Sequence, residues 1–187
     1  MAPAQNQLRA GAAGLAGVLV FAILPGLLLA VVLSLVLLIY RASRPQGSIL
    51  DKVPGKHAYS DIARHPENET VPGLFIFRLN APMFFANNAP LRERLKEMIC
   101  TTDPRPRAIL LDMEASSGLD ISSADMLAEL VAELKAQGVE LLLATVREPI
   151  RTMLWRSGVA QTIGEEHIYP VIEEGVEDFR ARFLARD

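Results

Sequence analysis

The first 40 residues differ from the rest of the chain in how hydrophobic and polar positions are arranged. A run of 31 residues without a charged side chain extends from Ala10 to Tyr40, and Arg9 is the only ionisable side chain before it. Such a run is typical of a transmembrane helix, since about 20 helical residues cross a hydrocarbon core of roughly 30 Å. We therefore expect a transmembrane segment at residues 15–40, preceded by an N-terminal segment of residues 1–14.

Pro25 and Gly26 interrupt the apolar segment. A proline inside a helix removes one backbone hydrogen bond, and in lipid the freed carbonyl must find a partner within the protein. The segment is therefore either one long kinked helix, tilted to absorb its length, or two short helices that need neighbouring helices around them. The sequence pattern is compatible with both arrangements.

The residues that flank the segment indicate its orientation. A secretory signal peptide would have several basic residues before a shorter apolar core and a small-residue cleavage site after it, and the sequence has neither. Arg41 and Arg44 follow the segment directly. Because cytoplasmic flanks carry an excess of basic residues, we expect a protein of the cell inner membrane with the residues after Tyr40 in the cytoplasm.

Beyond the segment, residues 41–72 form a polar connection with several prolines and glycines, which we interpret as a linker with one short strand at 48–53. Residues 73–187 then alternate between strand and helix patterns. Strands are expected at residues 74–77, 83–85, 108–111, 140–144 and 167–169. Four helices alternate with them and carry apolar side chains at helical spacing: Leu91, Leu95, Met98 and Ile99; Met126, Leu127, Leu130, Val131 and Leu134; Ile150, Met153 and Leu154; Ile172, Val176, Phe179 and Phe183. Asn88 is expected to cap the first helix, and Gly158 to end the third. The alternation predicts an α/β domain with a mixed, largely parallel sheet and helices packed on it.

Charge and composition exclude several classes of function. After position 40 the chain has 22 acidic and 18 basic residues, a net charge of −4 with both signs interspersed. A nucleic-acid groove would need a basic stripe, so we expect no nucleic-acid partner. Cys100 is the single cysteine, and no cysteine or histidine cluster has metal-ligand spacing. We therefore expect no disulfide within the chain, no metal and no cofactor.

Two serine pairs, Ser116-Ser117 and Ser122-Ser123, are the strongest candidates for chemistry. A nucleophilic serine would need a Gly-x-Ser-x-Gly turn, which neither pair has, so we expect no catalytic residue and no enzyme activity. Asp120 stands where an N-cap belongs, and its carboxylate can accept from the amides of Ser122 or Ser123. The first pair has the composition of a turn.

Three stretches of the chain carry a resemblance to a known family: VPGLFIFRLNAPMFFANNAPLRERL, AILLDMEASSGLDISSADMLAEL and GVELLLATVREPIRTMLWRSGV. Together they resemble the STAS domain (sulfate transporter and anti-sigma factor antagonist) in the form found at the C-terminus of SulP-type sulfate permeases, for which APMFFANN is especially typical. The stretch GVLVFAILPGLLLAVVLSLVLLIYRASRP resembles the last transmembrane helices of those permeases. The resemblance implies a STAS-type mixed sheet flanked by about four helices, preceded by one kinked or two short transmembrane helices.

The resemblance also separates the two serine pairs. Anti-sigma factor antagonists carry Asp-Ser-Ser-Gly at a helix start, eight positions after the polar residue that closes the preceding strand, and the serine after the aspartate accepts phosphate. Eight positions after Asp112 is Asp120, so the matching residues are Asp120, Ile121, Ser122 and Ser123. Ile121 occupies the acceptor position and has no hydroxyl. The resemblance therefore favours a helix cap or docking site here over a phosphate switch.

As a whole, the resemblance implies a membrane-anchored regulatory or assembly domain at the C-terminus of a SulP-type transporter of anions such as sulfate or bicarbonate. With at most two spans where the family's transport unit has many, the chain is expected to be a fragment unable to transport alone. Its expected partners are the membrane, the remainder of a transporter or a homodimer partner, and a cytoplasmic regulatory protein. The alternative is a self-standing, membrane-tethered STAS protein that regulates by binding another protein.

Overall fold

The structure, a computed structural model, describes residues 14, 17, 23–43 and 47–184 and divides the chain into two units, residues 1–42 and 43–187. In the first unit, helix α2 spans Leu24–Ala42 and is the one described helix that is long and apolar enough to cross a membrane. Its large apolar side chains are exposed, 62% for Leu27. The choice between one kinked helix and two short ones depends on residues 15–22, most of which lie outside the described residues.

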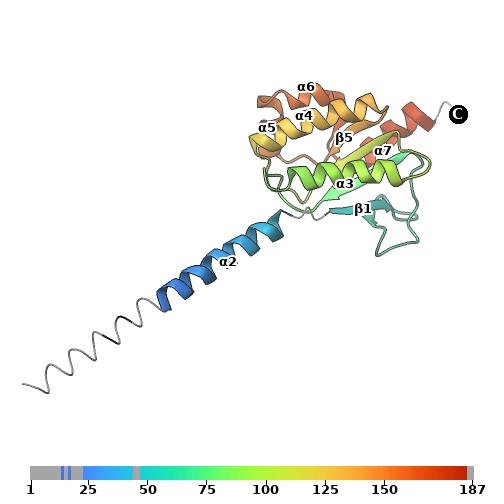
Figure 1. Ribbon diagram of the computed structural model, residues 1–187. Helices are drawn as coiled ribbons and strands as arrows, with labels where there is room; N and C mark the ends of the chain where they lie inside the picture. Colours follow the sequence, from blue (N-terminus) through green and yellow to red (C-terminus); the bar gives the residue numbers. More distant parts are fainter. Residues whose placement is uncertain (1–13, 15–16, 18–22, 44–46, 185–187) are drawn as a thin grey trace, which may run out of the picture. The chain divides into compact units, whose positions relative to one another are not determined.

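The second unit is built on a sheet whose described strands have the order β2-β1-β3-β4-β5-β6 (Figure 1). The strands are β1 (Gly47–Lys52), β2 (Tyr59–Asp61), β3 (Leu74–Leu79), β4 (Ala108–Asp112), β5 (Glu140–Ala144) and β6 (Ile168–Tyr169). Strands β3 to β6 run parallel to one another, whereas β1 is antiparallel to both β2 and β3. The predicted mixed, largely parallel sheet is confirmed.

Strands β1 and β2 lie within residues 41–72, the range that the sequence pattern gives as a linker. β1 overlaps the strand expected at 48–53 and pairs with β3 from Gly47, opposite Leu79, to Leu50, opposite Ile76. The three residues of β2 are too few to show a periodic pattern, and pairing with β1 defines them as a strand. This range therefore contributes one edge of the sheet.

Helices cover both faces of the sheet (Figure 1). One core contains residues from α3 (Asn88–Thr101), α4 (Ile121–Ala136), α5 (Glu148–Arg156) and α6 (Val159–Ile163), and the other contains residues from α7 (Ile172–Phe179). Successive residues of a strand point to opposite faces, so Leu111 and Leu143 belong to the first core and Leu110 and Leu142 to the second. The apolar side chains predicted to face inward from α3 and α4 are all buried.

The C-terminal part contains more short elements than the sequence pattern predicts. Gly158, with a φ of 78°, lets the chain leave α5 and enter α6 directly. The short helix η2 (Glu165–His167) precedes β6, and the π-helical turn η3 (Arg180–Leu184) follows α7. The helix α6 has five residues, too few to show a helical period in the sequence.

The strand expected at residues 83–85 is not formed. Met83 makes only an isolated parallel bridge, to Leu119, and Phe84 and Phe85 lie in a turn. The strand prediction is wrong because only Met83 bonds to the backbone of a neighbouring segment, whereas the amides of Phe84 and Phe85 donate to the side chains of Asn87 and Asp120.

The prediction that Asn88 caps the first helix of the domain is also wrong, because the N-cap position is Asn87 and its side chain makes no hydrogen bond to the helix. Asn88 is the first residue of α3, and Asn87 precedes the helix. The Asn87 side chain accepts a hydrogen bond from the amide of Phe84 at 3.1 Å and donates one to the carbonyl of Pro82 at 2.8 Å. Asn87 therefore stabilises the turn before α3, and the side chain of Asn88 is left for another partner.

Candidate docking site at the start of helix α4

Asp120 joins the loop after β3 to the first turn of α4. It is the N-cap residue of α4, and its Oδ1 accepts a hydrogen bond from the amide of Ser123 at 2.7 Å. Its Oδ2 accepts from the amide of Phe85 at 2.9 Å. The Asp120 amide donates to the carbonyl of Met83 at 3.2 Å. One residue thus fixes two segments that lie far apart in the sequence.

The surroundings of Asp120 favour its ionised form. Partial burial by itself would raise the pKa of this carboxyl, but hydrogen bonds from Ser123 and from the amide of Phe85 outweigh the burial and lower the pKa below its usual value. A negative charge also interacts favourably with the N-terminus of a helix. Asp120 therefore acts in this site as a charged acceptor of hydrogen bonds.

The second serine pair contributes one buried and one exposed hydroxyl. Ser123 is fully buried, and its hydroxyl donates to Oδ1 of Asn88 at 2.7 Å, which connects α4 to the first residue of α3. Ser122 is exposed and has no side-chain hydrogen bond to any residue that the structure describes. Ser123 is therefore structural, whereas Ser122 faces solvent at the start of the helix.

The first serine pair lies in the loop before the cap. Ser116 is fully buried, and its hydroxyl donates to the carbonyl of Gly118 at 3.3 Å. Ser117 is exposed. The structure thus places this pair in a turn that leads to Asp120 and gives Ser116 a partner inside that turn.

Two large apolar side chains beside Asp120 are exposed to solvent. Phe85 is 72% exposed and Ile121 is 67% exposed, although side chains of these types are commonly buried. Phe85 also lines a hollow of about 550 Å³, together with α3 and α4 residues that include Asn88, Arg92, Ser122 and Met126. The arrangement offers apolar contact area around a fixed cap, which suits binding of another protein surface.

Sequence reasoning identified Asp120 to Ser123 but not their partners Phe85 and Asn88, which lie 35 residues earlier. The stretch APMFFANN contained a signal for an exposed phenylalanine, because two adjacent phenylalanines next to turn-forming residues cannot both be buried on one side of a strand.

Within the described residues, no cluster of histidine, cysteine and acidic side chains could hold a metal ion.

The fold and the comparison with known families together define the class of domain. Residues 65–175 match the STAS domain family, and the chain belongs to that family. The sequence similarity extends beyond the domain. A protein of Mycobacterium tuberculosis named probable sulfate transporter is 32% identical over 178 residues, which are 95% of this chain and 32% of that protein. A match of this extent includes most of the apolar segment, and the chain spans about a third of that relative's length.

Two solved structures show the same fold. The STAS domain of a SulP transporter from Vibrio cholerae is 21% identical with a TM-score of 0.54, covering 66% of this chain and 94% of that one. The murine Solute Carrier 26 family member A9 anion transporter, in its inward-facing state, is 21% identical with a TM-score of 0.76, covering 86% of this chain and 26% of that one. The chain is thus a STAS region of the SulP type, and its relatives are transporters and STAS domains rather than enzymes.

Proposed function

We propose that the chain is the C-terminal, membrane-anchored STAS domain of a SulP-type transporter of sulfate or bicarbonate, with a role in regulation and assembly. The observation that carries this proposal is the match over 95% of the chain to a protein named probable sulfate transporter, because it includes most of the apolar segment together with the STAS domain. In this proposal α2 lies in the inner membrane, and the domain after Arg41 is cytoplasmic. The anion pathway belongs to parts of the transporter other than this chain.

The surface formed by Phe85, Asp120, Ile121 and Ser122, which we name the α4 docking surface, supports the assembly role. Its two apolar side chains are exposed, and the Asp120 carboxylate fixes the backbone on which each of them stands. A preorganised apolar surface loses little conformational entropy on binding. Its proposed occupant is the transmembrane part of a SulP-type transporter or a second copy of the chain.

Site-specific photo-crosslinking in membranes of the native cell tests this proposal. A photo-reactive phenylalanine analogue at position 85 or 121 is expected to form crosslinks to a SulP-type transmembrane unit or to a second copy of the chain, identified by mass spectrometry. Val171, which is 47% exposed at the start of α7, is the matched control position. Crosslinking at 85 and 121 no stronger than at 171 would contradict the docking role. Crosslinks only to a soluble protein would favour a tethered regulator instead.

A further inference from the structure

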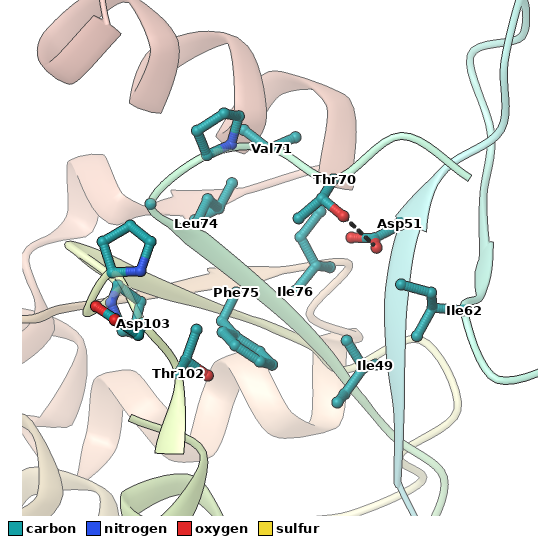
Figure 2. Close-up of a pocket in the computed structure, with 14 residues that line it drawn as sticks. Ile49, Asp51, Ile62, Thr70, Val71, Leu74, Phe75, Ile76, Thr102 and Asp103 are labelled. Carbon is teal, nitrogen blue, oxygen red and sulfur yellow. Dashed lines mark hydrogen bonds between the residues drawn. The ribbon is translucent and has the colours of Figure 1, made fainter. Parts of the chain in front are cut away.

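A second hollow lies at the opposite end of β3 from the α4 docking surface. It is bounded by β1, by the chain that enters β3 and by the loop that leaves α3, and its volume is about 360 Å³. This volume is in the range of small-molecule sites. Apolar side chains form most of the wall (Figure 2), among them Ile49, Ile62, Val71, Phe75 and Ile76. Ile49, Ile62 and Phe75 are only partly buried, so the apolar wall is open to solvent.

Asp51 is the buried acid of this hollow. The residue is 4% exposed, and its Oδ2 accepts a hydrogen bond from the hydroxyl of Thr70 at 3.0 Å (Figure 2). Among the described residues, no basic side chain pairs with Asp51, and Oδ1 accepts no hydrogen bond. Burial raises the pKa of the Asp51 carboxyl, and the bond from Thr70 offsets only part of that effect. The carboxylate therefore lacks a counter-ion at the place where the wall is otherwise apolar.

The apolar wall and the buried acid together restrict which kind of ligand can bind in this hollow. An anion would be repelled by Asp51, and by Asp103, which lines the same hollow from the loop after α3. A small hydrated cation would gain nothing from the apolar wall, and an uncharged apolar molecule would leave the carboxylate without a partner. A cation with an apolar body satisfies both features, because its charge compensates the buried acid while its body covers exposed apolar surface.

We propose that this hollow binds a small hydrophobic amine, with its ammonium group paired to the carboxylate of Asp51 and its apolar body against Ile49, Ile62 and Phe75. The site uses none of the residues of the α4 docking surface. Substitution of Asp51 therefore changes no residue of the α4 docking surface.

Nuclear magnetic resonance of the full-length chain in detergent micelles, with labelled isoleucine methyl groups, tests the amine site. The probes are phenethylamine, phenethyl alcohol and phenylpropionate, which share an aromatic ring but differ in charge. Phenethylamine is expected to shift the methyl signals of Ile49 and Ile62 saturably, with an affinity at least about tenfold higher than the alcohol. Phenylpropionate is expected to cause no saturable shift. Ile121, exposed on the docking surface, reports non-specific apolar binding and should not follow Ile49.

Substitution of Asp51 provides a second test of the amine site. Asp51→Asn keeps the shape of the side chain but removes its charge, so the affinity for phenethylamine should fall about tenfold or more while that for the alcohol stays unchanged. Asp125→Asn, an exposed carboxylate of α4, is the matched control and should leave both affinities unchanged. Equal affinity for amine and alcohol, or an unchanged amine affinity in Asp51→Asn, would overturn the proposal. If Asp51→Asn does not fold, the comparison of the three probes on the unaltered chain still decides.

Discussion

Asp120 uses both oxygens of its carboxylate to hold backbone amides, one in α4 and one in the loop after β3. Asp120→Ala removes both acceptors, so we predict that the free energy of unfolding falls by about 0.5–2 kcal/mol, the usual cost of losing an N-cap. Asp120→Asn keeps one side-chain oxygen that can cap the helix, so its free energy of unfolding should fall by less. Chemical unfolding followed by circular dichroism measures both. Ser117→Ala, exposed in the same loop, is the control, and a loss in Asp120→Ala no larger than in this control would show that the cap contributes nothing.

Glu173 is a second residue whose side chain joins separate elements. It connects α7 to the edge of the sheet. Its carboxylate accepts hydrogen bonds from Tyr59 and, at 2.9 Å, from Lys52, with His57 at 3.3 Å. The Tyr59 hydroxyl and then Lys52 lower the pKa of Glu173 to about 2. We predict that Glu173→Gln lowers the free energy of unfolding at pH 7 by about 1.5–3 kcal/mol, the range for hydrogen bonds to a charged group. Glu174→Gln, exposed on the same turn, should change it little.

The pH dependence of that loss follows from the direction of the shift. The folded-state pKa of Glu173 lies below the value of about 4.3 for an unfolded glutamate. Its contribution is therefore complete above that unfolded value and disappears as the pH falls toward 2. The stability difference between the wild type and Glu173→Gln should be constant from pH 7 to about 5 and shrink at lower pH. A difference that grows on acidification would contradict this assignment.

Among the contacts of single residues, those between residues close in the sequence could be predicted from the sequence. Those between residues far apart in the sequence could not. The capping position of Asp120 depends on an amide three residues later, so the order of residue types is enough to suggest it. The bond from Phe85 to Asp120 and the bond from Ser123 to Asn88 both span 35 residues and depend on how strands and helices pack. The same holds for the pocket acid Asp51, whose burial depends on the surrounding tertiary structure.

At the scale of elements, the strands before residue 71 determine where a folded domain can begin. We predict that a chain of residues 47–187 unfolds cooperatively and that a chain of residues 71–187 does not. The shorter chain lacks β1 and β2, which leaves one edge of β3 unpaired and removes the buried side chain of Leu50, alone worth about 1.5–3 kcal/mol. Differential scanning calorimetry compares the two. A cooperative transition of the shorter chain at the same temperature would show that β1 and β2 add nothing to the domain.

The elements that the sequence predicts well are those with a long or fully apolar pattern. The helices α3 and α4 show their buried faces as a helical period, and β4 and β5 each contain four consecutive apolar residues. Tertiary contacts decide the conformation of three short segments, each three to five residues long: the turn at residues 83–85, β2 and α6. A pattern that short does not distinguish a strand from a turn or a helix.

At the scale of the whole molecule, the topology of the chain in the membrane is the property to measure. Alkaline phosphatase fused after Asp187 should be inactive and a green fluorescent protein fused there should fluoresce, because the first requires export and the second folds in the cytoplasm. Arg41 and Arg44 are the basis of this expectation. The same phosphatase behind a cleavable export signal is the positive control. Strong phosphatase activity of the fusion after Asp187 would reverse the orientation proposed for the domain.

The two outer strands of the sheet are also its shortest, with three residues in β2 and two in β6. Each therefore presents few unpaired backbone groups along its outer side. A long, flat edge recruits strands from other molecules and is a common origin of aggregates, and short edges are one of the ways in which natural sheets avoid it. In the proposed membrane-anchored arrangement, neighbouring domains can thus collide repeatedly without joining their sheets into fibrils. Specific association is left to the side chains on their helices and loops.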